Sequence, residues 1–216
     1  MLHGVFWNLF LAAIPVALGY LLTWVLDLQQ KKKALVLLAV PVGLAWLVFL
    51  PNTCYLLTEW RHLLFDARWE ELLDRAHVDR NAMLRVAAWS LWFLVYSGAG
   101  VLLFALSIRP VERWLRSRKA STVVFAPFFF TLVSLGVYLG LIKRYNSWDL
   151  VQKPLTIWNS VLDALTTVPL LTAILVFAAI LWMLYEAVDL WADGVSDRLR
   201  SWGLLGRGGG KKKGKK

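Results

Sequence analysis

Two short polar segments hold the side chains of this sequence that are best suited to binding or chemistry. The first, residues 51–62, supplies an amide, a phenol, a carboxylate and an imidazole, from Asn52, Tyr55, Glu59 and His62. The second, residues 143–149, supplies Arg144, Asn146, Ser147, Trp148 and Asp149. Each segment follows a long apolar stretch, and polar groups at membrane depth are costly enough to be functional candidates by default. Together these side chains are the candidate ligand-binding residues.

Helical spacing gives the first segment one polar face. Asn52, Tyr55, Glu59 and His62 fall at positions i, i+3, i+7 and i+10, which lie on the same side of an α-helix. Pro51 directly precedes them, and proline suits the first turn of a helix. We therefore expect a new helix to begin at Pro51.

A divalent metal is one occupant that these residues allow. Glu59 and His62 have the Glu-x-x-His spacing that lets two side chains of one helix reach the same ion. Asp149, from the second segment, would complete a donor set suited to zinc, iron or manganese. A single Glu-x-x-His is common on surface helices, so the alternative that Glu59 pairs with Arg61 or Arg144 stays open.

An organic anion is a second occupant. The guanidinium of Arg144 offers a bidentate fork to phosphate or carboxylate, and Asn146 and Trp148 beside it suit a lipid headgroup. A hydrolase would instead use Ser147 as nucleophile and His62 as base, but the sequence lacks a nucleophile-elbow motif. Whether the chain is an enzyme stays open.

The elements that position these residues are membrane-spanning helices. The chain has 216 residues, of which 59% are hydrophobic, against about 45–50% in soluble domains. A spanning helix needs about 20 apolar residues, and five stretches without Asp, Glu, Lys or Arg meet that length. We predict an all-α membrane protein, a bundle of five transmembrane helices, at about residues 5–26, 34–57, 86–108, 120–142 and 164–185.

Charge predicts the orientation of the bundle. Lys and Arg are enriched in cytoplasmic loops of membrane proteins. With the N-terminus outside, the first and third loops and the C-terminal tail place sixteen basic residues in the cytoplasm, against eight outside. Both polar segments then lie at the outer surface. The transmembrane domain covers residues 1–190, and residues 191–216 form a basic cytoplasmic tail that is expected to be disordered from about residue 206.

Two connecting segments have helical patterns of their own. In the second loop, apolar residues from Trp60 to Ala76 recur at helical spacing between charged ones, which predicts an amphipathic helix lying on the membrane surface. It either rests on the bilayer or covers the polar segments as a lid. Residues 147–163, with Pro154 near their middle, predict a short interfacial helix before the fifth span.

The two polar segments resemble the signatures of a bacterial family of multi-pass membrane proteins known only as a domain of unknown function. The family's L-P-N-x-x-Y-x-x-T-[DE]-x-x-H pattern is matched by residues 50–62, and its R-x-N-S-W-D pattern by residues 144–149. The resemblance implies a bacterial membrane protein with a shared polar site. It implies no reaction.

The sequence thus predicts an integral protein of a bacterial plasma membrane with an outward-facing polar ligand or metal site. The alternatives are a structural or assembly subunit of a membrane complex and a small transporter. Expected partners are the lipid bilayer, anionic lipids at the basic tail and another membrane protein. Basic charge alone does not indicate nucleic acid, because no interleaved aromatic pattern accompanies it.

Overall fold

The predicted all-α membrane fold is confirmed by the computed structural model, which describes residues 2–29, 36–58, 67–146 and 148–204. Within these ranges, five helical segments are long and apolar enough to cross a membrane. They are Val5–Leu28, Leu37–Thr58, Arg80–Ser117, Thr122–Leu141 and Val168–Ser201. Each overlaps one of the five stretches predicted from the sequence.

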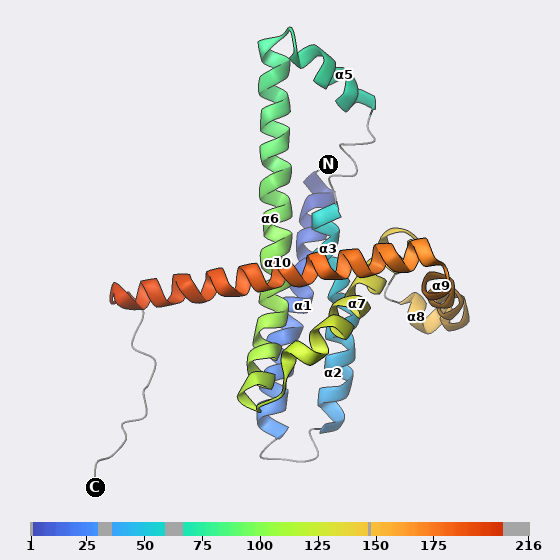
Figure 1. Cartoon of the computed structure of the whole chain (residues 1–216), viewed down its shortest axis with the longest axis vertical. Coiled ribbons are helices and arrows are strands. Elements are labelled where there is room, and N and C mark those ends of the chain that lie inside the picture. The colour runs from blue at the N-terminus through green and yellow to red at the C-terminus, as the bar shows by residue number, and fades with distance from the viewer. Residues whose placement is uncertain (1, 30–35, 59–66, 147, 205–216) are drawn as a thin grey trace.

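The helices form an elongated assembly in which two directions dominate. The helices α1, α2, α3 and α6 run along its long axis, while α7 slants and α10 crosses the others (Figure 1). Their bounds are α1 Leu2–Gln29, α2 Val36–Phe49, α3 Pro51–Thr58, α5 Ala67–Ala76, α6 Arg80–Ser117, α7 Thr122–Leu141, α8 Asp149–Gln152, α9 Pro154–Thr166 and α10 Val168–Ser201.

The second span is divided by a proline. Pro51 has no backbone N–H to continue the helix that ends at Phe49, and it opens α3 as the sequence predicts. The carbonyl oxygen of Leu50 accepts two hydrogen bonds from Thr53, one from the backbone N–H at 3.1 Å and one from Oγ1 at 2.8 Å. The break is therefore closed by local bonds, as a membrane interior requires.

Glycines let the helices approach closely on both sides of α6. A Cβ added at Gly19 of α1 would lie 2.5 Å from the carbonyl oxygen of Ser107. A Cβ added at Gly100 of α6 would lie 2.7 Å from the Cβ of Leu56 in α3. Small residues at such contacts are typical of packing between membrane helices, where close van der Waals contact drives association. The glycines therefore fix α1 and α3 against α6.

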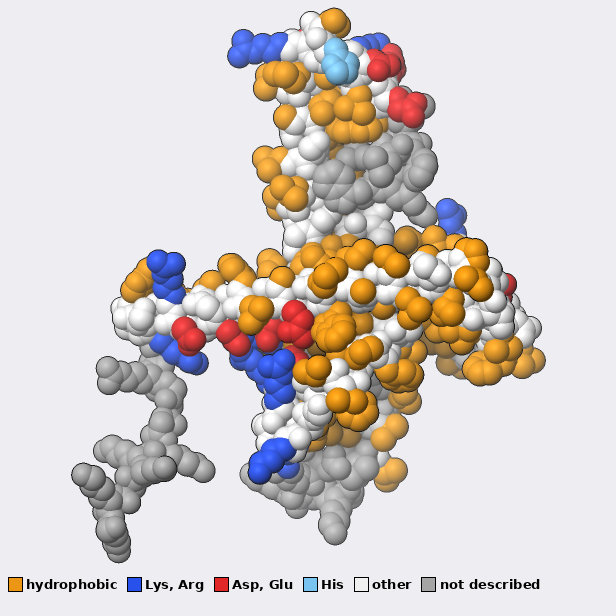
Figure 2. Space-filling model, in the orientation of Figure 1, with side chains coloured by type: hydrophobic (Ala, Val, Ile, Leu, Met, Phe, Trp, Pro, Cys, Tyr) orange, Lys and Arg blue, Asp and Glu red, His pale blue; other side chains and the backbone are white. Residues whose placement is uncertain are grey.

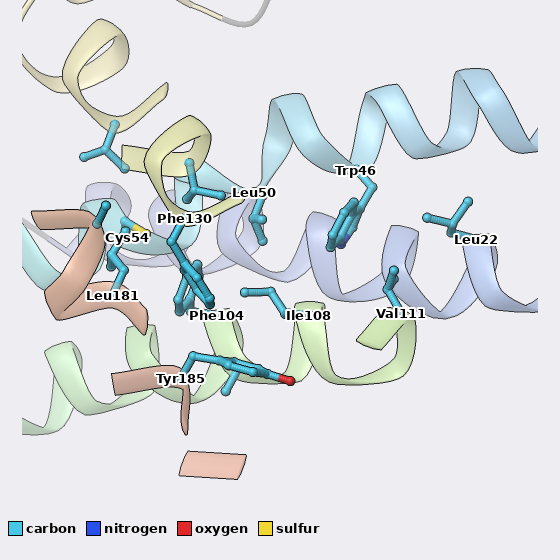
Figure 3. Close-up of a cluster of buried hydrophobic side chains, with 14 residues drawn as sticks. Leu22, Trp46, Leu50, Cys54, Phe104, Ile108, Val111, Phe130, Leu181 and Tyr185 are labelled. Atoms are coloured by element: carbon cyan, nitrogen blue, oxygen red, sulfur yellow. The ribbon is translucent and has the colours of Figure 1, made fainter. Parts of the chain in front are cut away.

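An aromatic core joins α7 and α10 to the first three spans. Phe130 of α7 stacks on Trp182 of α10 with ring centroids 6.3 Å apart. Phe130 also meets Phe104 of α6 edge-on (Figure 3). The hydroxyl of Ser134 donates a hydrogen bond to the carbonyl oxygen of Ile174 at 2.8 Å. These contacts position the start and the middle of α10 across α7.

Apolar side chains cover much of the outer surface. Figure 2 shows them over α7, α9 and the first half of α10, while charged side chains gather near the crossing of α6 and α10. On α9, Leu155, Trp158, Leu162 and Leu165 are all exposed and lie on one face at helical spacing. The helix expected within residues 147–163 is thus present, with an apolar stripe that suits the membrane surface.

The amphipathic helix of the second loop is also present, as α5. Trp69, Leu72 and Ala76 are half-buried where α5 packs on α6, and the charged residues between them are exposed. The N-terminal part of its predicted range, residues 60–66, lies outside the described residues. A hydrogen bond from the Asn81 N–H to the Asp79 carboxylate, at 2.9 Å, caps the start of α6.

Candidate functional site

The two polar segments meet where α3 packs on the end of α7. Gly136 of α7 makes room for Pro51, whose Cγ would lie 2.6 Å from a Cβ added there. One turn later Gly140 makes room for Tyr55, whose Cζ would lie 2.8 Å from an added Cβ and whose hydroxyl would lie closer still. Pro51 and Tyr55, four residues apart, therefore fit against two glycines that are also four residues apart. The two helices run in the same direction at this contact.

The second polar segment is a tight turn that follows α7 directly. Arg144 has a φ of 58°, a left-handed conformation that is uncommon for a residue with a side chain. The backbone N–H of Tyr145 then returns to the carbonyl oxygen of Leu139 at 3.1 Å. This hydrogen bond fixes the segment to the last helical turn of α7, next to Gly140, against which Tyr55 packs.

Asp149 closes this turn rather than facing outward. Its side-chain oxygen accepts a hydrogen bond from the backbone N–H of Asn146 at 2.7 Å, and its own N–H donates to the carbonyl oxygen of Asn146 at 3.0 Å. Asp149 is only 7% exposed, and Lys153 Nζ lies 3.7 Å from its carboxylate. Its first role in the structure is to shape the turn.

Two contacts attach the turn to α9. The hydroxyl groups of Tyr145 and Ser160 share a hydrogen bond at 3.1 Å. The ammonium of Lys143 donates to the Asp163 carboxylate at 3.3 Å, and this bond raises the pKa of Lys143 above its usual value. The charged ammonium is therefore present at neutral pH, and the contact is lost as the pH rises through that raised pKa.

The structure describes six of the candidate ligand-binding residues. Asn52 and Tyr55 are half-buried on α3, Asp149 is buried, and Arg144, Asn146 and Trp148 are exposed. Glu59, His62 and Ser147 lie outside the described residues, so two of the three candidate metal ligands are not placed. Among the residues that are placed, no group of three or more His, Cys, Asp or Glu side chains could hold a metal ion.

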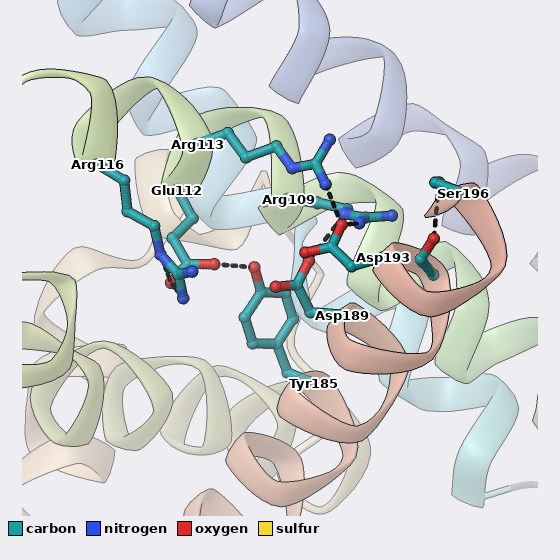
Figure 4. A network of polar contacts seen from close by, with 9 residues as sticks. Arg109, Glu112, Arg113, Arg116, Tyr185, Asp189, Asp193 and Ser196 are labelled. Atoms are coloured by element: carbon teal, nitrogen blue, oxygen red, sulfur yellow. Dashed lines mark hydrogen bonds and ion pairs between the residues drawn. The ribbon is translucent and has the colours of Figure 1, made fainter. Parts of the chain in front are cut away.

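A second polar arrangement lies where α6 crosses α10, near the opposite end of α7. The Nε of Arg109 lies 2.7 Å from the Asp189 carboxylate, and both Arg109 and Arg113 contact the carboxylate of Asp193 (Figure 4). The side chains of Arg109 and Asp189 are 14% and 9% exposed. Two spans are thus joined by ion pairs, of which the Arg109–Asp189 pair is largely withdrawn from solvent.

The same arrangement continues along α6. The Tyr185 hydroxyl donates a hydrogen bond to the Glu112 carboxylate, which also accepts bonds from Arg116 at 2.6 and 3.0 Å. On the other side of α6, the indole N–H of Trp114 donates to the Asp27 carboxylate of α1 at 2.9 Å. The end of α6 is therefore bound to both α1 and α10 by charged groups.

The arginines of this arrangement enter the sequence analysis only as basic residues of the third loop. Their pairing with carboxylates of α10 was not predicted, although the spacing of the residues on both helices indicates it. Arg109, Glu112, Arg113 and Arg116 fall at positions i, i+3, i+4 and i+7 along α6, and Tyr185, Asp189 and Asp193 are four residues apart along α10. Residues at this spacing share a helix face. Two faces rich in opposite charge at the ends of two spans would indicate an interhelical ion-pair network.

Of the comparisons with known proteins, one identifies a family. No curated protein and no solved structure matches the chain. The profile of one family, described as "Protein of unknown function (DUF1361)", matches residues 7–184, a range that includes both polar segments and all five apolar spans in whole or in part. The chain belongs to this family of unknown function.

Proposed function

We propose that this chain is an integral protein of a bacterial plasma membrane that binds an anionic ligand at the outer surface, between the end of α3 and the turn after α7. The observation that carries the proposal is the contact of Tyr55 with Gly140. It sets the first polar segment beside the last turn of α7, from which the second polar segment begins. The two polar segments, which are far apart in sequence, therefore lie side by side at the end of α3.

The side chains at that place suit a phosphate or carboxylate group. Arg144 and Asn146 are exposed, and their backbone is held by the turn that Asp149 closes. A guanidinium fork with an adjacent amide recognises anionic oxygens in a fixed orientation. Trp148, also exposed, suits the headgroup level of a membrane. Glu59, His62 and Ser147 would extend the site from segments outside the described residues.

The outward orientation rests on charge. The first and third loops and the C-terminal tail hold sixteen of the 24 basic residues, and basic loops favour the cytoplasmic side. With these segments inside, the N-terminus, the end of α3 and the turn after α7 face outward. The two polar segments, at residues 50–62 and 144–149, then lie on the same outer surface.

We expect an anionic lipid or metabolite to be retained by the purified protein and to be lost when the turn is changed. The variant is Arg144→Ala combined with Asn146→Ala, which removes the fork and the amide but leaves Asp149 to close the turn. Mass spectrometry of species extracted after mild detergent purification measures the loss, which we expect to be at least about tenfold, since each charge-assisted bond contributes roughly 1.5–3 kcal/mol.

The matched control is Arg75→Ala combined with Asn81→Ala, an arginine and an asparagine that are also exposed but lie on α5 and α6. Retention of the same species by wild type and the Arg144 variant would contradict the proposal.

Elemental analysis of a His62→Ala, Asp149→Ala variant tests the divalent-metal alternative for the same site. A metal lost stoichiometrically in that variant and kept in the control would assign the site to a metal.

A second candidate function, that of a structural or assembly subunit, is supported by the end of α10. The C-terminal end of this helix projects past the other helices (Figure 1), and Leu190 and Trp191 in its second half are exposed. Such an arm suits contact with another membrane protein. Stoichiometric co-purification of a partner that is lost on Leu190→Ser, Trp191→Ser substitution would favour this function over ligand binding.

A further inference from the structure

An apolar cavity lies between α2, α6, α7 and α10, near the α6–α10 ion pairs and away from the turn after α7. Its volume is about 290 Å³. Aromatic rings form much of its wall, among them Trp46, Phe129, Phe130 and Tyr185, and Trp46 stacks on Phe129 with ring centroids 5.7 Å apart. Engineered apolar cavities of about 150 Å³ stay dry and bind a molecule of the size of benzene, so this one has room for a longer hydrocarbon.

Four polar side chains that line the cavity, those of Trp46, Glu112, Tyr185 and Glu186, already make hydrogen bonds within the protein. Glu112 accepts bonds from Tyr185 and Arg116, and Glu186 accepts one from the indole N–H of Trp182 at 3.1 Å. The indole N–H of Trp46 donates to the carbonyl oxygen of Ser107 at 3.0 Å. The cavity therefore offers its occupant mainly carbon surface, which favours a hydrocarbon chain over a polar molecule.

One wall of the cavity belongs to the outer surface of the bundle. Val123 and Phe125, at the start of α7, line the cavity and are each 66% exposed. In a membrane, a side chain exposed at this position on an apolar span faces lipid. A hydrocarbon chain can thus enter sideways from the bilayer, with no need for a path through water.

The turn that joins α6 to α7 brings positive charge to the same place. Arg116, Arg118 and Lys119 lie between Leu115 and Ala120, and both of these line the cavity. The Arg118 guanidinium is held over the Trp114 ring, 5.1 Å from its centroid. Basic groups beside gaps between membrane helices are a recurring arrangement for anionic lipid headgroups.

From this combination we infer a specific site for an anionic glycerophospholipid, with one acyl chain in the cavity and the phosphate against Arg118 and Lys119. The apolar volume selects the chain and the basic turn selects the charge. Neither feature is shared with the ligand site at the turn after α7, so the two sites can be tested separately. The site differs from general contact with the bilayer because it holds a single lipid molecule and prefers a negatively charged headgroup.

Native mass spectrometry of delipidated protein tests this site, with phosphatidylglycerol and phosphatidylcholine of identical acyl chains as the probes. We expect the wild type to retain one phosphatidylglycerol at about tenfold lower lipid concentration than phosphatidylcholine, since each nearby basic residue favours an anionic headgroup. Arg118→Gln with Lys119→Gln should abolish that preference and leave weak binding of both lipids. Ala126→Leu, which fills the cavity from α7, should weaken binding of both.

The matched control is Arg198→Gln with Arg200→Gln on α10, because Arg198 also lies over an indole ring, 5.5 Å from the centroid of Trp202, but borders no part of the cavity. It should bind as the wild type does. Equal retention of the two lipids by the wild type, or an unchanged preference in the Arg118, Lys119 variant, would overturn the inference. The wild-type comparison and the Arg118, Lys119 variant test the charge preference without Ala126→Leu. The helicity of the Ala126→Leu protein is checked by circular dichroism. If the folded variant binds both lipids as tightly as the wild type, the cavity is not the acyl-chain site.

Discussion

Gly100→Ala is expected to lower the free energy of unfolding by about 1–3 kcal/mol, as overpacking of a close contact does. The added Cβ would lie 2.7 Å from the Cβ of Leu56 and 3.2 Å from the carbonyl oxygen of Thr53. Neither atom is the end of a flexible side chain, so α3 has to move away from α6. A loss of stability would be informative, because helix propensity alone favours alanine over glycine by about 1 kcal/mol and would raise the free energy of unfolding.

Gly98→Ala is the matched control on the same helix. Nothing lies within 4 Å of a Cβ added at Gly98, so helix propensity alone should act and stabilise the protein by about 0.5–1 kcal/mol. Reversible unfolding in mixed detergent micelles measures both changes. If the two substitutions shift stability by the same amount and in the same direction, the close α3–α6 contact is not present in the folded protein.

Asp189→Ala is expected to have the largest effect, about 3–5 kcal/mol of lost stability. Removal of one partner from a buried ion pair leaves the other charge uncompensated, and Arg109 is only 14% exposed on its side chain. Asp193, which also contacts Arg109, is half exposed and can compensate only in part. The measurement is again the free energy of unfolding, together with the apparent Tm in detergent.

Two comparisons make this expectation specific to the ion pair. Asp197→Ala removes a carboxylate that is 76% exposed on the same helix and should change stability by about 0.5 kcal/mol or less. The double variant Arg109→Leu, Asp189→Leu removes both charges, and it should recover most of the loss because apolar replacement of a buried pair is often neutral. A double variant as unstable as the sum of its single changes would exclude coupling between the two residues.

The fold was largely predictable because a membrane-spanning helix requires a long run of apolar residues, which is visible in the sequence. A run such as residues 86–108 has no charged residue, and a helix is the only open-ended structure that satisfies its backbone in lipid. Pro51 was predictable for a similar reason, since a residue without an N–H marks a helix start. Local rules were sufficient for both.

The contacts between spans were not predictable by the same rules. Nothing in the sequence says that Gly140 receives Tyr55 or that Gly100 receives Leu56, because a close approach depends on which helix faces which. The ion pairs of Arg109 and Asp189 depend likewise on the direction in which α10 crosses α6. Counting charges gave an orientation for the membrane but no partner for any single charge.

In the candidate site, too, local features were predictable from the sequence and contacts between helices were not. Helical spacing aligned Asn52 with Tyr55, and charge topology predicted that the two polar segments share a surface. The contact that joins them, Tyr55 on Gly140, required three dimensions. The structure also gave Asp149 a specific task, closure of the turn, where its residue type alone had suggested a ligand.

The ion pairs between α6 and α10 also set an order of events during synthesis. Arg109 and Asp193 are 84 residues apart in the chain, and ribosomes add about 5–20 residues per second. The arginine is therefore made roughly 4–17 s before its carboxylate partner, at the chain-growth rate just given. Throughout that interval its charge has to be solvated by water or headgroups, which holds the end of α6 at the membrane surface. The fifth span, which is made after α6, is thus the one that completes the anchoring of α6.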